Sequence, residues 1–166
     1  TNIITYKQIF PLFKENKIWL GVSHGDMSFK VPDNYPPRKT RYWVDDSGQK
    51  WRSMGNIEWV TNLDYSQRHE DLILYKRYNS KDFPDYDNYK AINVSKVADI
   101  PMDYSGIMGV PITFLDKYNP DQFEIIGLDR YTVPKEKLVG GRLSINGKTK
   151  YARILIKNKK VQKIEN

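Results

Sequence analysis

Residues 105–128 read SGIMGVPITFLDKYNPDQFEIIGL and hold two apolar stretches separated by a polar one. Pro111 follows Gly109 and can open a helix over residues 111–118, because a first-turn proline needs no backbone N–H. The run 122–128 has the length and apolar character of a buried strand. This stretch therefore predicts a helix followed by a strand of the core.

Strand patterns extend outward on both sides of this stretch. Residues 41–44 and 49–53 flank a polar tetrapeptide at 45–48, which predicts a β-hairpin. Residues 142–145 and 149–156 flank Asn146-Gly147, and this pair is a strong hairpin signal because both residues accept a positive φ. Alternation and apolar runs predict further strands at 17–22, 27–31, 56–62, 71–76 and 91–94, with a turn at residues 24–26.

Helical patterns are fewer than strand patterns. Residues 3–16 predict a helix in which Thr5 and Gln8 form a capping box. Pro11 would lie too deep in that helix for a first-turn proline, so we expect a kink or two short helices there. Strands outnumber helices, and the predicted fold class is α+β with a mixed or mainly antiparallel sheet. The length of 166 residues predicts one segment, 1–166.

The composition excludes several kinds of site. The chain has no cysteine and two histidines, so disulfides, thiolate metal sites and a histidine-only metal site are not expected. No apolar run approaches the roughly 20 residues that cross a membrane, and no signal peptide opens the chain. We therefore expect a cytoplasmic protein without a membrane partner and without a bound metal.

Positive charge is concentrated at one end of the chain. The net charge is +7, and residues 134–166 hold ten Lys and Arg against two Glu, a net of +8. The other 133 residues hold 17 Lys and Arg against 18 Asp and Glu, a net of −1. Such a basic hairpin and tail suits a polyanion such as nucleic acid, although a solvated tail is the competing interpretation.

Two groups of residues are candidates for contact with DNA. In both groups, cations that can bind phosphates lie on predicted turns or strands. The first group also carries aromatic rings, such as Tyr42 and Trp43, that can stack on bases. The candidates in the first group are Arg38, Lys39, Arg41, Lys50, Trp51 and Arg52, and those in the second are Arg142, Lys148 and Lys150. The alternatives are that the tryptophans belong to the core and that the cations only solubilise exposed hairpins.

No catalytic signature stands out in the chain. Neither of the Gly-rich phosphate-binding motifs occurs, and Gly106 and Gly109 have the wrong spacing, so close packing explains them more simply. The paired carboxylates Asp45-Asp46 and Glu70-Asp71 lack a histidine or metal set at useful spacing. We therefore assign no catalytic and no cofactor-binding residue.

Five long segments resemble one known family. They are TYKQIFPLFKENKIWLG at 5–21, IEWVTNLD at 57–64, YDNYKAINVSKVADIP at 86–101, the opening stretch at 105–128, and INGKTKYARILI at 145–156. Together they resemble, in the same order, the adenine-specific DNA methyltransferases of the EcoRI modification type. The resemblance extends over nearly the whole chain.

The resemblance implies transfer of a methyl group from S-adenosylmethionine to the exocyclic amino group of adenine in duplex DNA. It also implies a Rossmann-like α/β parent with strand-rich recognition elements, and a target base flipped out of the stack. The family's Gly-rich cofactor turn and its Asn-Pro-Pro-Phe motif are both missing, since Asn119-Pro120 lacks the second proline and the aromatic residue. We expect this chain to be the C-terminal part, with the cofactor site in an N-terminal catalytic part of the same protein.

The expected function is DNA recognition and completion of the core within a restriction–modification methyltransferase, and the chain alone is expected to be inactive. A non-enzymatic nucleic-acid-binding module is the alternative from another class, and an RNA-binding protein is a third.

Overall fold

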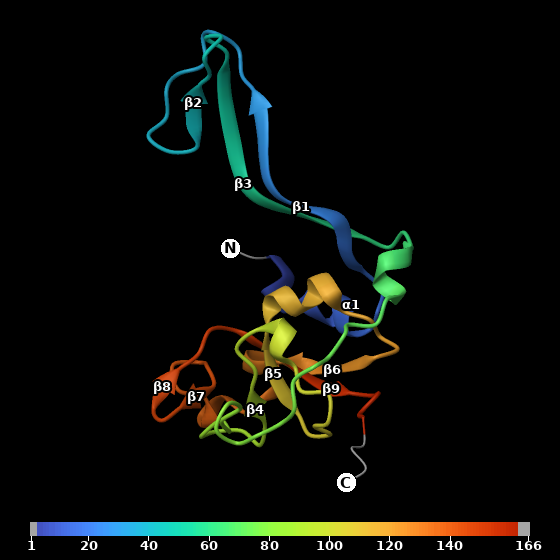
Figure 1. The fold of residues 1–166 in the computed structure, drawn as a ribbon. Coiled ribbons are helices and arrows are strands. Elements are labelled where there is room, and N and C mark those ends of the chain that lie inside the picture. Colours follow the sequence, from blue (N-terminus) through green and yellow to red (C-terminus); the bar gives the residue numbers. More distant parts are fainter. Residues whose placement is uncertain (1–2, 163–166) are drawn as a thin grey trace. The chain divides into compact units, whose positions relative to one another are not determined.

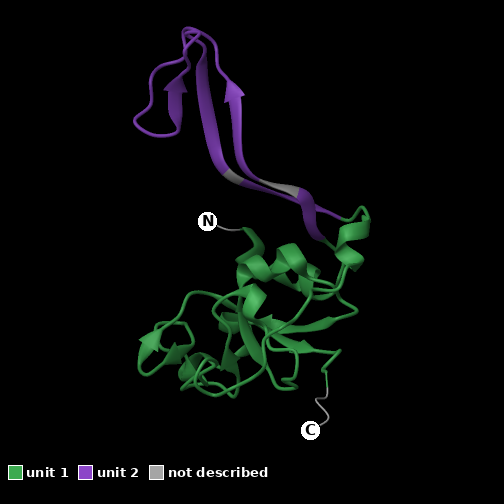
Figure 2. Cartoon of the chain, viewed as in Figure 1, with its two compact units in different colours: residues 1–18, 62–166 green, residues 19–61 purple. Residues whose placement is uncertain are grey.

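The computed structural model describes residues 3–162, with the backbone alone at residues 23, 24 and 56. The chain divides into two compact units (Figure 2). The strand unit comprises residues 19–61, and the core unit comprises residues 1–18 and 62–166. The sequence predicted a single segment with a basic part at 134–166, and it did not predict that residues 19–61 form a unit of their own.

The strand unit is a three-stranded antiparallel sheet in the order β1-β3-β2 (Figure 1). Its strands are β1 (Trp19–Lys30), β2 (Tyr42–Val44) and β3 (Lys50–Thr61). The predicted hairpin around residues 45–48 is confirmed. The predicted turn at 24–26 is wrong, because β1 continues through it with register irregularities, and the strands expected at 49–53 and 56–62 are one strand.

The core unit is built on a four-stranded mixed sheet in the order β4-β5-β9-β6 (Figure 1). β5 and β6 both pair antiparallel with β9, and β4 pairs parallel with β5. The strands are β4 (Ile92–Asn93), β5 (Met108–Pro111), β6 (Phe123–Leu128) and β9 (Arg153–Asn158). A mixed sheet with few helices agrees with the α+β prediction, and the expected strand at 122–128 is confirmed as β6.

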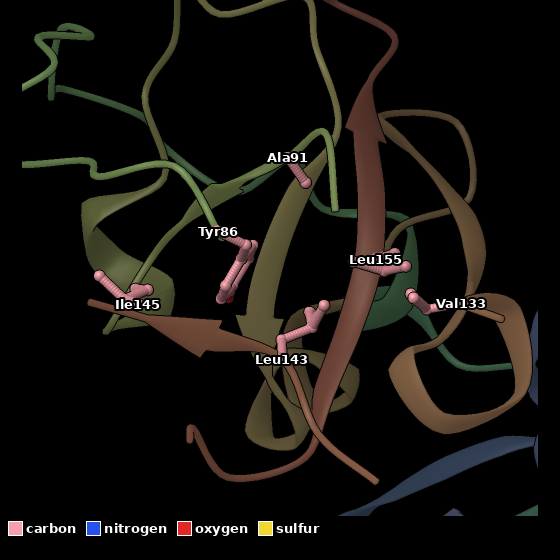
Figure 3. Close-up of a cluster of buried hydrophobic side chains, with 6 residues drawn as sticks. All are labelled: Tyr86, Ala91, Val133, Leu143, Ile145 and Leu155. Carbon is pink, nitrogen blue, oxygen red and sulfur yellow. The ribbon is translucent and has the colours of Figure 1, made fainter. Parts of the chain in front are cut away.

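The hydrophobic core lies on this sheet. Phe114 and Phe123 are fully buried and meet edge to face, with ring centroids 5.3 Å apart. A second cluster gathers six buried side chains from several segments of the core unit (Figure 3). Its members are Tyr86, Ala91, Val133, Leu143, Ile145 and Leu155. A Cβ at Gly109 would overlap the Tyr86 ring, so this glycine permits close packing, as its sequence context predicts.

Short helices connect the strands of the core unit. They are η1 (Ile3–Thr5), α1 (Phe10–Lys14), η2 (Ser66–His69), η3 (Val97–Asp99), η4 (Ile112–Lys117), α2 (Asp129–Thr132) and η5 (Lys135–Lys137). Two short helices replace the single helix expected at 3–16, but they are separated by residues 6–9 and do not meet at Pro11 as predicted. The proline itself lies in the first turn of α1, and the expected cap at Thr5 is wrong, because α1 begins only at Phe10.

The strand predicted at residues 71–76 is wrong. Ile73 and Tyr75 are 85% and 62% exposed, although the run is apolar. The buried side chain of Gln122 takes the place of a neighbouring strand. Its Oε1 accepts from the Leu72 N–H at 2.7 Å, and its Nε2 donates to the Leu72 carbonyl at 2.8 Å. These bonds satisfy the backbone at Leu72 without a ladder.

The hairpin around Asn146-Gly147 is much shorter than predicted. Only β7 (Ser144–Ile145) and β8 (Lys148–Thr149) pair across the turn. The apolar run that follows belongs to β9, in the interior of the core sheet, where Arg153 to Ile156 are all buried. A strand buried on both faces gains more from burial than it would from extending a solvated hairpin.

Candidate nucleic-acid interface

One face of the strand unit carries a row of aromatic and cationic side chains. Lys30, Trp51 and Trp43 are paired across the three strands and therefore share a face. The two indole rings stack with centroids 6.3 Å apart and an interplanar angle of 5°, and the Lys30 Nζ lies 5.6 Å from the Trp51 centroid. The row presents flat rings beside a positive charge.

The next row lies on the opposite face, because side chains alternate along a strand. It comprises Phe29, Arg52 and Tyr42. Tyr42 stacks with Tyr35 at 6.3 Å, and the Arg38 guanidinium lies 5.9 Å from the Tyr35 centroid. Both faces of the sheet thus combine aromatic rings with cations.

Few of the apolar side chains in the strand unit are buried. In the described part of the unit, the buried apolar residues are Leu20 and Val31. Trp43 is 41% exposed and Trp59 is 58% exposed, while Trp51 is half-buried. The alternative that both hairpin tryptophans are core residues is therefore wrong for Trp43. A sheet with two exposed aromatic faces has the character of an interaction surface.

Three cations of the strand unit are bonded to neutral acceptors. Arg41 Nη1 donates to the Met54 carbonyl at 3.0 Å, and Arg52 Nη1 donates to the Thr40 carbonyl at 3.4 Å. Lys50 Nζ donates to the Asp33 carbonyl. Arg38 and Lys39 are exposed in the loop before β2. Within the described residues, none of these five cations forms an ion pair, so their charges are not neutralised locally.

Asp45 organises the hairpin tip between β2 and β3. Its Oδ1 accepts from the Ser47 hydroxyl at 2.6 Å and from the Ser47 and Gln49 N–H groups at 3.0 Å each. Its Oδ2 accepts from the Trp51 indole N–H at 2.7 Å. These donors, the Ser47 hydroxyl above all, lower the pKa of Asp45 from 3.8 to about 2. The carboxylate thus fixes the orientation of the Trp51 ring.

This geometry predicts a tip that resists acid. A lowered pKa means that the stabilisation by Asp45 is complete above pH 3.8 and is lost only as the pH falls through about 2. The Trp51 indole N–H resonance should therefore keep its position down to about pH 3 and shift near pH 2. An NMR titration measures this, with Asp45→Asn as the control that removes the titration. A shift centred near pH 4 would contradict the bonding described here.

The second group of candidates lies in the core unit. The β7–β8 turn is bonded to Asp87, whose Oδ1 accepts from the Asn146 N–H at 3.0 Å and whose Oδ2 accepts from the Gly147 N–H at 2.9 Å. These bonds lower the pKa of Asp87, and the bond from the Gly147 N–H has the largest effect. Lys148 is exposed and Lys150 is half-buried. A carboxylate under the turn weakens the positive potential at its tip.

The basic end of the chain is not one continuous cationic surface. Arg153 is 8% exposed and donates through Nε to Asn93 Oδ1 at 3.3 Å, and Lys160 pairs with Asp71 at 2.6 Å. Lys163 lies outside the described residues. Only part of the charge counted in residues 134–166 is therefore available to a polyanion.

Arg142 lines a pocket of about 600 Å³ in the core unit. Three further cations line the same pocket: Lys7, Arg130 and Lys135. Sequence reasoning missed them, because Lys7 is distant in sequence and because Arg130 and Lys135 belong to short helices whose placement beside Arg142 only the folded core unit shows. Arg142 thus lies at a different place from Lys148 and Lys150, neither of which lines the pocket.

Two features of other protein classes are missing from the part of the chain that the structure describes. It holds no cluster of three or more acidic, histidine or cysteine side chains that could bind a metal ion. It also holds no helix with the length and apolar character needed to span a membrane.

Comparison with known proteins identifies the family. The family model described as "Adenine-specific methyltransferase EcoRI" matches residues 1–159. The chain is 52% identical over 98% of its length to the Type II methyltransferase M.EcoRI of Escherichia coli, and it covers 49% of that protein. It is 38% identical to M.MpnI of Mycoplasma pneumoniae and 37% identical to M.MgeORF184P of Mycoplasma genitalium, covering 54% and 55% of them.

No solved structure matches the chain. The chain spans about half the length of the curated relatives it matches. The resemblance found in the five sequence segments is thereby confirmed, and its order along the chain agrees with a match that extends over nearly every residue. This chain belongs to the EcoRI family of adenine-specific methyltransferases.

Proposed function

We propose that this chain is the C-terminal, DNA-contacting part of an adenine-specific DNA methyltransferase. The whole enzyme would transfer a methyl group from S-adenosylmethionine to the adenine amino group, and an N-terminal catalytic part would hold the cofactor in a Rossmann-like core. The observation that carries this proposal is the strand unit, whose two exposed faces combine stacked aromatic rings with cations that have no carboxylate partner. A DNA substrate is consistent with a cytoplasmic location.

The long antiparallel pair of β1 and β3 is the kind of element that can enter a groove of DNA. The major groove of B-DNA, about 12 Å wide, admits a β-ribbon. The exposed cations Arg38 and Lys39 are placed in a loop from which they can bind backbone phosphates. Asp45 and Asp46 make the 45–48 tip acidic, so the tip itself should stay away from phosphates. We therefore expect the 36–41 loop and the faces of the sheet to contact DNA.

The first test removes two exposed cations of this loop. Arg38→Ala together with Lys39→Ala should weaken binding to duplex DNA about ten-fold and reduce the slope of log K against log salt by up to about 2, because two released counterions are lost. Fluorescence anisotropy across a salt series measures both quantities. The matched control is Lys96→Ala with Lys117→Ala, which removes the same charge from exposed positions of the core unit. If the two variants had equal affinity for duplex DNA and equal salt slopes, the loop would not be part of the interface.

The pocket of the core unit does not fit S-adenosylmethionine. The cofactor carries a sulfonium cation, and four cationic side chains line the pocket without an acidic one. We therefore propose that the cofactor site is in the N-terminal part. Isothermal titration calorimetry of this chain with S-adenosylmethionine should show no micromolar binding. Binding in that range by this chain would place the cofactor site here.

A non-enzymatic nucleic-acid-binding module is the second candidate, and the same exposed strand unit supports it. The gene sequence on the N-terminal side discriminates between the two, since the methyltransferase needs a Gly-rich turn and an Asn-Pro-Pro-Phe motif there. Gel shifts with duplex DNA and duplex RNA separate the RNA-binding alternative, because the deep, narrow major groove of RNA does not admit a β-ribbon.

A further inference from the structure

The basic pocket of the core unit is built from Lys7 and from the stretch of chain between residues 130 and 142. Lys7 follows η1, Arg130 belongs to α2, Lys135 begins η5, and Arg142 ends a tight turn. The Tyr131 hydroxyl, also at the pocket, donates to the Thr5 carbonyl at 2.9 Å. This bond holds the segment that carries Lys7 against α2. The fold thus adds the distant Lys7 to three cations that lie within one stretch of the sequence.

The two arginines are positioned by their surroundings. Arg142 Nη1 lies 3.8 Å from Oδ1 of Asp129, a fully buried carboxylate at the start of α2. The same oxygen accepts from the Arg130 N–H at 2.7 Å. The Arg130 guanidinium lies 5.9 Å from the Tyr131 centroid, and its buried Nε has no hydrogen-bond acceptor among the described residues. Buried N–H groups in proteins are nearly always hydrogen-bonded, so this one lacks an acceptor that a ligand could supply.

The charge balance of the pocket favours a dianionic or polyanionic ligand. Four cations line it, and Asp129, whose pKa is raised by burial, offsets at most one of them, which leaves at least three positive charges in excess. No carboxylate lines the pocket itself. Arginine guanidinium groups present paired N–H donors that match phosphate oxygens, and lysines add mobile point charges.

The turn at residues 139–142 leaves space beside the cations. Val139 and Arg142 exchange backbone hydrogen bonds of 3.0 and 3.1 Å around Gly140 and Gly141. Both glycines have a positive φ, +56° and +74°, and a Cβ at either would meet no atom within 4 Å. Because both glycines line the pocket, their backbone is open to a ligand, as in other phosphate sites.

We propose that this pocket binds a phosphodiester of the DNA backbone, so that the core unit contributes its own anchor to the duplex. This inference rests on the proposed function, which supplies DNA as the ligand. Lys7, Arg130 and Lys135 thereby join Arg142 as phosphate-contacting residues. The anchor fixes the position of the duplex and carries no base sequence information.

The test uses exposed residues of the pocket, so that the fold is preserved. Lys7→Ala with Lys135→Ala should weaken binding of the 166-residue chain to a short duplex at least five-fold and lower the salt slope by up to about 2. The control is again Lys96→Ala with Lys117→Ala, neither of which lines the pocket. It should stay within about two-fold of the unaltered chain.

A second measurement does not depend on any variant. Titration of the unaltered chain with inorganic phosphate, followed by NMR, should shift the Gly140 and Gly141 amide resonances, and Lys7→Ala with Lys135→Ala should weaken these shifts. If the unaltered chain binds duplex DNA and the pocket variant matches the control, the pocket proposal is overturned and the proposed function stands. If the unaltered chain binds no duplex, both are overturned.

Discussion

Removal of the strand unit is expected to abolish tight DNA binding while the core unit stays folded. Residues 19–61 would be replaced by a short Gly-Ser linker between Ile18 and Asn62, which is feasible because Trp19 and Thr61 are directly paired. The excised unit contains Leu20 and Val31 as its buried apolar residues, so little core is lost. The affinity for duplex DNA should fall at least about 100-fold, because both aromatic faces and their cations are removed together.

Two measurements make this result interpretable. Anisotropy with labelled duplex reports the affinity, and circular dichroism reports the folding of the core unit. All four tryptophans, Trp19, Trp43, Trp51 and Trp59, lie in the strand unit, so tryptophan fluorescence is useless for the shortened chain. Undiminished DNA binding by a folded core unit would show that the strand unit serves a different partner.

Phe123→Ala should cause a large loss of stability in the core unit. Phe123 is fully buried on β6 and meets Phe114 edge to face at 5.3 Å. Truncation removes most of a buried ring and leaves a cavity under a rigid sheet. The free energy of unfolding should fall by about 3–5 kcal/mol. Urea denaturation, followed through the amide resonances of β9, measures the change in the core unit alone.

The matched control is another apolar residue truncated to alanine. Ile73 is 85% exposed, so Ile73→Ala should change the free energy of unfolding by less than about 0.5 kcal/mol. The contrast between these variants tests the location of the core. A loss below about 1 kcal/mol for Phe123→Ala would mean that β6 is not packed as described.

Local signals predicted the elements whose geometry is set by neighbouring residues. The hairpin at 41–53 formed as expected because Asp45, Ser47 and Gly48 close its tip through short-range bonds. The apolar run 122–128 became β6 for a similar reason, since it has few other ways to bury its side chains. Five segments that resemble the family in the same order along the chain also predicted the family, and the comparisons confirmed it.

Elements that depend on distant partners were not predictable. Residues 71–76 have a strand-like composition, yet the side chain of Gln122 satisfies Leu72 and leaves Ile73 exposed. Nothing in TKYARILI shows where the hairpin stops and the central strand begins. That boundary depends on the space between β5 and β6, which other segments create.

By itself, the sequence determined the family, the α+β class and the hairpin with its aromatic and basic residues. Tertiary structure alone decided which charges can act together. Lys7, Arg130, Lys135 and Arg142 meet at one pocket, while Arg153 is buried and Lys160 is paired with Asp71. The physical reason is that charge is counted along the chain, whereas electrostatic potential depends on distance and burial in the folded protein.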